Sequence, residues 1–246
     1  MSYRDRLFAD YRATHAVYAD GADELRTEWF RDHVARNYRR LLPLAKERPR
    51  LLEVGAGRGF LLAALREAGY GDLTGVDLSL EDVAYARDRL QLEVVLSDAR
   101  EYLRGNPDTF DVVVAKAVLE HVRKDEVLPF LEDMRDALRP GGRVIIEVPN
   151  MDWLFAAHER FLDFTHEVGF TRESLAQLLR SVFGNAQVHA AEEPMPQPWK
   201  PHLRRRVLRP LVRALVGVVL HGLGEGAAET LWQVRSIIGV ARKEGA

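Results

Sequence analysis

Residues 51–59 read LLEVGAGRG, a short apolar run followed by three glycines at alternate positions. The apolar run predicts a buried strand, and the helical pattern of residues 60–68 predicts that a helix follows the glycines. Glycine lets the backbone turn tightly and lets a ligand approach without a Cβ in the way. The first amide groups of the following helix point toward such a ligand. This unit therefore predicts a nucleotide-type binding loop in an α/β fold.

The spacing of the glycines narrows the kind of loop. A dinucleotide-binding fingerprint needs its third glycine three positions after the second, whereas Gly59 follows Gly57 by two positions. A phosphate-binding loop of the Walker type ends in Gly-Lys-Ser/Thr, which is absent from this stretch. Both common phosphate-binding loops are therefore disfavoured.

Outward from the loop, short β-rich runs alternate with helical stretches. The run 110–115 is apolar throughout, as in a strand buried on both faces, and Pro-Gly-Gly at 140–142 predicts a helix stop and a turn. Residues 150–170 are expected to be irregular. The alternation predicts βαβ units, a parallel sheet and right-handed connections. The expected strands are 51–54, 73–76, 93–96, 110–115, 143–148, 186–190 and 236–241, and the expected helices are 60–68, 80–90, 124–138 and one that starts near Thr171 and Ser174.

Acidic residues stand at the ends of three consecutive predicted strands, namely Glu53, Asp77 and Asp98. Ligands of open α/β sheets bind at the carboxyl ends of the strands. A carboxylate at Asp77, some twenty residues after the loop, can accept both ribose hydroxyls of a nucleotide. Taken singly, each aspartate could instead cap a helix.

Three segments, 53–59, 110–122 and 138–146, together resemble motifs of class I S-adenosylmethionine-dependent methyltransferases. The resemblance covers roughly residues 51–150. It implies a mostly parallel seven-stranded sheet with helices on both faces and strand order 3-2-1-4-5-7-6. It also implies S-adenosylmethionine (SAM) as cofactor and a role for Asp98 at the adenine amino group. The expected cofactor-binding residues are Glu53, Gly55, Ala56, Gly57, Gly59, Asp77, Leu78, Asp98, Ala99 and Lys116.

Composition sets the outer bounds. The net charge of −2 over 246 residues gives the whole molecule no polyelectrolyte character. The absence of cysteine excludes disulfides, thiolate metal sites and cysteine nucleophiles. The charged N-terminus shows no secretory signal, and the apolar stretch 214–220 is far shorter than the roughly 20 residues of a membrane span. We expect a cytoplasmic protein, with peripheral contact to the inner face of a membrane left open.

The methyl acceptor is indicated by residues 163–175, which resemble a pattern in bacterial methyltransferases of polysaccharide and glycan biosynthesis. This resemblance implies O-methylation of a sugar hydroxyl on a saccharide, nucleotide sugar or lipid-linked glycan. The alternatives are a natural-product or quinone O- or N-methyltransferase, and a non-catalytic SAM-binding module of a glycan assembly complex. Nucleobase acceptors, and hence nucleic-acid partners, are disfavoured, because residues 115–118 read AKAV and lack the Pro-Pro-aromatic motif.

A sugar hydroxyl is a poor nucleophile, and histidine can accept its proton near neutral pH. We expect His166 to be the base, with His121 second and His158 third. Each could instead be structural: His166 could hold its loop to Asp163 or Glu167, and His121 could line the cofactor pocket. The chain has no HExxH motif, and we expect no metal ion in the chemistry.

The two tails predict the domain organisation. Residues 1–45 are expected to form a helical lid, 46–193 the core, 194–234 a basic amphipathic insertion, and 235–246 the last strand of the core. Residues 194–224 contain no acidic residue, and the apolar residues of 200–223 recur at near-helical spacing. This segment is expected to lie in a membrane interface, to pack on the core or a homodimer partner, or to contact RNA.

Overall fold

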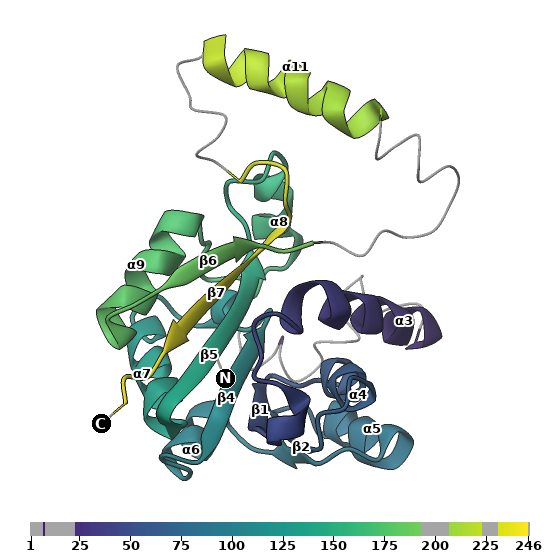
Figure 1. Cartoon of the computed structure of the whole chain (residues 1–246), viewed down its shortest axis with the longest axis vertical. Coiled ribbons are helices and arrows are strands. Elements are labelled where there is room, and N and C mark those ends of the chain that lie inside the picture. The colour runs from purple at the N-terminus through teal and green to yellow at the C-terminus, as the bar shows by residue number, and fades with distance from the viewer. Residues whose placement is uncertain (1–6, 8–22, 193–206, 223–230, 246) are drawn as a thin grey trace.

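In the computed structural model, residues 7, 23–192, 207–222 and 231–245 are described. They contain a seven-stranded sheet with order β3-β2-β1-β4-β5-β7-β6 (Figure 1). The strands β1 to β5 pair in parallel, and β7 is antiparallel to both β5 and β6. The predicted fold and strand order are confirmed. The strands are β1 Arg50–Val54, β2 Asp72–Asp77, β3 Val94–Leu96, β4 Phe110–Lys116, β5 Leu138–Pro149, β6 Gln187–Ala190 and β7 Ser236–Arg242.

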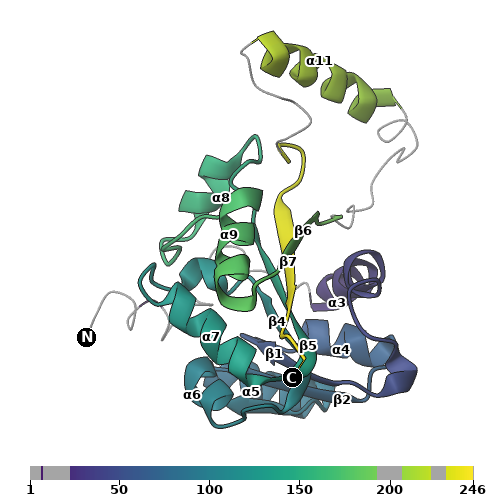
Figure 2. The ribbon, with the colours of Figure 1, turned by 60° about the vertical axis from the view of Figure 1, so that its left-hand side comes forward.

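Helices cover both faces of the sheet (Figure 2). One apolar cluster joins the sheet to α3, α4 and α5, and a second joins it to α6, α7 and α9. Central strand residues such as Leu52, Val113 and Ile145 are fully buried between the two layers, as expected for a parallel sheet. The bounds are α3 Asp23–His33, η2 Val34–Tyr38, η3 Ala45–Glu47, α4 Phe60–Glu67, α5 Leu80–Leu90, α6 Ala99–Arg104, η4 Leu119–His121, α7 Val127–Ala137, α8 Ala156–Leu162, α9 Arg172–Phe183 and α11 Arg209–Gly222.

Two local expectations are corrected. The region 150–170 was expected to be irregular, but it contains α8. The Pro-Gly-Gly stretch does not separate α7 from β5, because β5 already starts at Leu138. The extra residues are absorbed as a register shift against β4, between the pairs Phe110–Leu138 and Val112–Arg143. Gly141 adopts a positive φ of 79° there, which glycine tolerates without strain.

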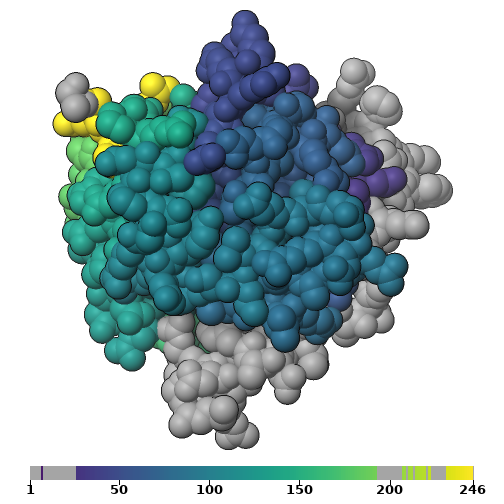
Figure 3. Space-filling view, turned by 90° about the horizontal axis from the view of Figure 1, so that it is seen from below, coloured from purple at the N-terminus to yellow at the C-terminus, as the bar shows by residue number. Residues whose placement is uncertain are grey.

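The predicted lid and insertion are described in part. The start of the lid, 1–6 and 8–22, lies outside the described residues, while α3 packs on α4. Of the insertion, 193–206 and 223–230 lie outside them, and α11 stands apart from the sheet and its helices in both ribbon views. The face in Figure 3, formed by the blue and teal middle of the chain, is the side away from α11. Among the described residues, none of the helices has the length and apolarity to cross a membrane.

Candidate active site at the carboxyl edge of the sheet

The glycine loop connects β1 to α4. Gly55, Gly57 and Gly59 all adopt positive φ, at 69°, 51° and 78°. A Cβ on Gly55 would come within 2.5 Å of Val118, and one on Gly59 within 2.7 Å of Leu92, whereas one on Gly57 would meet none of the described residues within 4 Å. The described residues therefore leave space beside the backbone of Gly57, where a ligand can approach the loop.

Asp77, the last residue of β2, braces this loop. Its Oδ2 accepts the N–H of Gly57 at 2.7 Å and its Oδ1 accepts the N–H of Ser79 at 2.8 Å. Burial raises the pKa of the Asp77 carboxyl, against the lowering effect of these amides. The neighbouring Leu78 is 67% exposed. Asp77 thus holds the loop and lies at the same edge as the open space beside Gly57.

Asp98 follows β3 and is the N-cap of α6. Its Oδ1 accepts the amide hydrogens of Arg100 at 2.9 Å and Glu101 at 3.0 Å. In this structure the side chain of Asp98 therefore caps α6, as the alternative expectation had it. Its contact with a cofactor stays a prediction. Ala99 begins α6, so the predicted pair Asp98–Ala99 sits at the third strand of the same edge.

Glu53, the residue before the last one of β1, and Lys116, the last residue of β4, lie at this edge on adjacent paired strands. The Glu53 side chain is buried, and its Oε2 has no hydrogen-bond partner among the described residues. Burial and the carboxylate of Asp77 raise the pKa of Glu53 well above its ordinary value. A buried polar atom without a partner is costly, so this oxygen points to a donor supplied by a ligand.

A buried network around Glu147 of β5 joins α3 and η2 to the sheet. The Glu147 carboxylate accepts hydrogen bonds from His33 Nε2 and Tyr38 Oη, both at 2.8 Å, and pairs with Lys116 Nζ at 3.1 Å. His33 stacks on Trp29, with ring centroids 4.5 Å apart, and Lys116 Nζ lies 5.3 Å from the Trp29 ring centre. Burial opposes ionisation of Glu147, but Lys116, His33 and Tyr38 lower its pKa to about 2.

We expect Glu147→Gln to lower the free energy of unfolding by about 2 kcal/mol at pH 7, because hydrogen bonds to charged groups contribute about 1.5–3 kcal/mol. The folded-state pKa is depressed, so the contribution is present above the ordinary carboxyl pKa and is lost as the pH falls toward about 2. Denaturant unfolding at pH 7 and at pH 3 measures the effect. The difference between wild type and variant should shrink at pH 3, and an equal difference at both would contradict the assigned ion pair.

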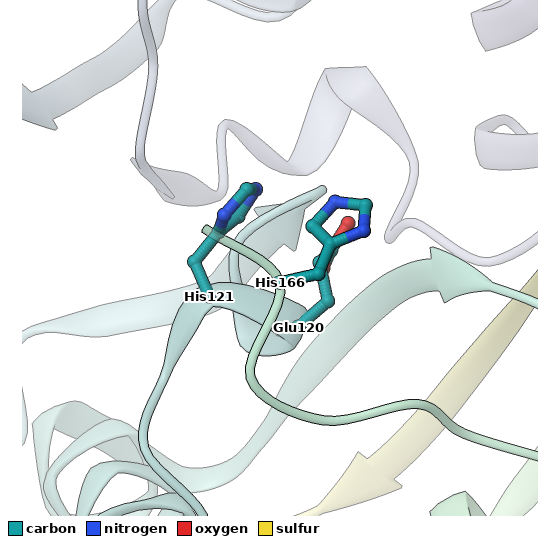
Figure 4. Close-up of side chains that lie close together, drawn as sticks. All are labelled: Glu120, His121 and His166. Carbon is teal, nitrogen blue, oxygen red and sulfur yellow. The ribbon is translucent and has the colours of Figure 1, made fainter. Parts of the chain in front are cut away.

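Glu120, His121 and His166 form a second cluster (Figure 4). Glu120 and His121 lie in η4, just after β4, and His166 lies in the loop between α8 and α9. One ligand-type atom from each of the three lies within 4.8 Å of the others. The two imidazole rings meet edge to face, with centroids 4.8 Å apart. The structure thus brings together the first two predicted base candidates, while His158 is exposed on α8.

Hydrogen bonds define the orientation of both rings. His166 Nδ1 lies 3.0 Å from the carbonyl oxygen of Glu159, which can only accept, so Nδ1 carries the hydrogen. His121 Nδ1 lies 2.8 Å from Thr165 Oγ1, whose own hydrogen goes to Asp163 Oδ1. His121 therefore also carries its hydrogen on Nδ1, an assignment made from the network. Burial lowers the pKa of His166, which favours the neutral ring.

Glu120 is the member of this cluster that sequence reasoning missed. Its side chain is buried, its Oε2 has no hydrogen-bond partner among the described residues, and burial raises its pKa to about 8. The network of Glu147 with His33 and Tyr38 was also missed. No local signal marks either feature, because the partners come from distant segments of the chain.

Comparison with known proteins defines the family. The family model for a methyltransferase domain matches residues 26–182, and the chain belongs to this family. A methyltransferase of Archaeoglobus fulgidus described as SAM-dependent shares the fold with TM-score 0.66 and 23% identity, over 91% of this chain and 100% of that one. A Haemonchus contortus phosphoethanolamine N-methyltransferase, solved in complex with SAM, has TM-score 0.63 and 20% identity, over 99% and 60%. The predicted enzyme class and its SAM cofactor are confirmed at the level of the family.

The curated relatives correct the predicted acceptor. The ubiquinone biosynthesis O-methyltransferase of Aliivibrio fischeri is 32% identical over 115 residues, 44% of this chain and 48% of that protein. The mitochondrial enzyme of the same name from Rattus norvegicus is 30% identical over 139 residues, 52% and 39%. The chain thus matches about half or less of the length of these relatives. The prediction of a sugar hydroxyl is wrong on this finding, and the matches give no support to an association with glycan biosynthesis.

Proposed function

We propose that this chain transfers the methyl group of SAM to a hydroxyl of a small quinone-type phenol. The observation that carries the proposal is that two features lie at the same edge of the sheet. The glycine loop follows β1 and is held by Asp77 of β2, and the cluster of Glu120, His121 and His166 lies at the end of the neighbouring strand β4. The names of the curated relatives support a phenolic acceptor from ubiquinone biosynthesis.

The residues present fit SAM. The open space beside Gly57 admits the ligand close to the backbone, and the buried oxygen Glu53 Oε2 offers an acceptor to an ammonium or hydroxyl group. Asp77 and Asp98 would accept from the ribose and the adenine. Bound SAM would supply an electrophilic methyl group, with the electron pair of the broken carbon–sulfur bond left on sulfur, and the acceptor hydroxyl would give up its proton to a base at the site or to solvent. The chain itself mainly holds the two reactants close and aligned.

The surface around α8, the helix that follows the carboxyl end of β5, is apolar. Around α8, Leu154 is 58% exposed, Phe155 59% and Phe161 77%. Large exposed aromatic and aliphatic side chains near a binding edge are typical of an interaction surface. They suit an aromatic ring with a hydrocarbon tail better than a sugar, whose hydroxyl groups need polar partners.

The test is methyl transfer from radiolabelled SAM to soluble catechols and hydroquinones, with nucleotide sugars as the comparison. Calorimetry with SAM and S-adenosylhomocysteine on the same protein reports cofactor binding. Micromolar binding with label in the phenols and none in the sugars is the expected result. Binding without label in any phenol would reject the acceptor class, and no binding to folded protein would reject the whole proposal.

We also propose that α11 contacts a membrane surface, where a lipid-tailed quinone would be found. Its Leu211 is 61% exposed, Leu215 67% and Val218 71%, which fits a helix lying in an interface. We expect the protein to sediment with vesicles of anionic phospholipid, and Leu211→Asp with Leu215→Asp to abolish sedimentation. Unchanged sedimentation of this double variant, or a dimer in light scattering that the double variant disrupts, would assign the face to another role.

A further inference from the structure

In contrast to the metal-free chemistry expected from the sequence, we propose that Glu120, His121 and His166 bind a divalent transition-metal ion. Their ligand-type atoms lie within 4.8 Å of one another. An ion placed between them would need only small side-chain shifts to reach the metal–ligand bond lengths of about 2.0–2.2 Å expected for such ions. The carboxylate Oε2 of Glu120 is buried and has no hydrogen-bond partner in the described part of the chain. Figure 4 shows all three side chains projecting to the same side of the two segments.

The hydrogen bonds behind the two histidines are of the kind that orients histidine ligands in metal sites. Histidine ligands commonly donate their second ring N–H to a carbonyl or a carboxylate, which sets the ring orientation and raises ligand basicity. His166 donates from Nδ1 to the carbonyl of Glu159. His121 donates from Nδ1 to Thr165, which donates in turn to the buried carboxylate of Asp163. Both rings therefore keep Nε2 as the lone-pair atom.

The scaffold holds the ligands together without an ion. The carbonyl of Glu120 accepts the amide hydrogens of Glu167 at 2.8 Å and Val168 at 3.2 Å, so the loop of His166 is fastened to the segment of Glu120 and His121. The guanidinium of Arg160 donates to the carbonyls of His166 and Glu167. Such preorganisation lowers the entropic loss on binding an ion.

The ligand types indicate the class of ion. Two imidazoles and one carboxylate suit zinc, manganese, iron or cobalt, whereas magnesium and calcium prefer oxygen ligands throughout. Three protein ligands leave at least one position open, as in catalytic sites. This part of the inference rests on the proposed function: the open position would take the acceptor oxygen, whose proton passes to solvent when the oxygen binds the cation.

The test uses chelator-dialysed full-length protein titrated with Co²⁺, followed by visible absorption, and with Zn²⁺ and Mn²⁺ by calorimetry. We expect one ion per chain, with imidazole-type cobalt bands and no binding of Mg²⁺ at the same concentration. Glu120→Gln and His166→Ala should each weaken binding at least tenfold. His158→Ala is the matched control, because this exposed histidine lies outside the cluster, and it should bind as wild type does.

Failure of this inference is distinguishable from failure of the proposed function, because SAM binding is measured on the same preparations. Circular dichroism establishes that each variant is folded. No Co²⁺ or Zn²⁺ binding to protein that binds SAM would overturn the metal site and leave the methyltransferase proposal standing. Binding that both cluster variants leave unchanged would overturn it as well.

Discussion

Replacing His166 by alanine is expected to lower turnover of methyl transfer by about 10²-fold or more, with SAM affinity changed by less than about twofold. A group that takes up or stabilises the charge of the acceptor oxygen contributes about 10²–10⁴-fold, and His166 lies in the cluster beside Glu120 and His121. It is held from behind by the carbonyl of Glu159, so removing the ring leaves the loop fastened through Glu167 and Val168.

The measurement is kcat with a phenolic acceptor and calorimetry with SAM, for wild type and His166→Ala. Unaltered turnover in His166→Ala would remove this residue from the reaction. The metal titration of the same variant separates its two possible roles. If His166 is the proton acceptor, as predicted from the sequence, His166→Ala loses turnover while ion binding is absent or unchanged. If His166 is a metal ligand, the variant loses both turnover and ion binding.

Replacing Asp77 by alanine is expected to weaken SAM binding by at least tenfold, and up to about 10²-fold. The carboxylate would accept both ribose hydroxyls, and a hydrogen bond to a charged group contributes about 1.5–3 kcal/mol. A second effect adds to the first, because Asp77 also holds the N–H of Gly57 and thereby the shape of the glycine loop.

Asp77→Asn is the matched control for that second effect. Its amide oxygen can still accept from Gly57, while the charge and one acceptor are lost, so its affinity should fall between wild type and Asp77→Ala. Calorimetry with SAM and with S-adenosylhomocysteine measures all three proteins. Wild-type affinity in Asp77→Ala would contradict the ribose role, and equal loss in both variants would show that charge, not loop geometry, decides.

Much of the fold follows from local patterns. The strands beside the glycine loop are buried on both faces and therefore read as continuous apolar runs. The start of α9 also follows from the sequence, since Thr171 forms the capping box with Ser174 that these two residues predict. By contrast, α8 is short, buries none of its residues and begins without a capping side chain. A helix this short is not stable on its own sequence and forms because of the surrounding structure. The sequence of α8 therefore does not predict it.

The site divides along the same line. The predicted cofactor residues lie where parallel strands end, and topology alone brings those ends to one edge. The cluster of Glu120, His121 and His166 depends on how the loop before α9 folds back onto η4, and the pair His33–Glu147 joins residues 114 positions apart. Side-chain contacts between distant segments leave no periodic pattern, so a single sequence does not predict them.

The wrong acceptor has a physical explanation in the segment 163–175. Asp163 and Thr165 hold the ring of His121, and the amide hydrogens after His166 bond to Glu120. Phe170 is buried and pairs with Asn150 at the end of β5. These residues build and fasten the loop whatever molecule is methylated. A resemblance in this stretch therefore reports how the loop is constructed rather than which hydroxyl it faces.

The contacts of Glu147 also affect where an independently folding unit of this chain begins. An ionised carboxylate in the middle of a protein needs substitutes for the water it has lost, and two of its three come from His33 and Tyr38. The N-terminal helices thus supply hydrogen-bond donors that replace water around the buried Glu147 carboxylate. A boundary at residue 46 would remove His33 and Tyr38 from Glu147 on β5. We therefore expect the smallest unit that folds on its own to include α3.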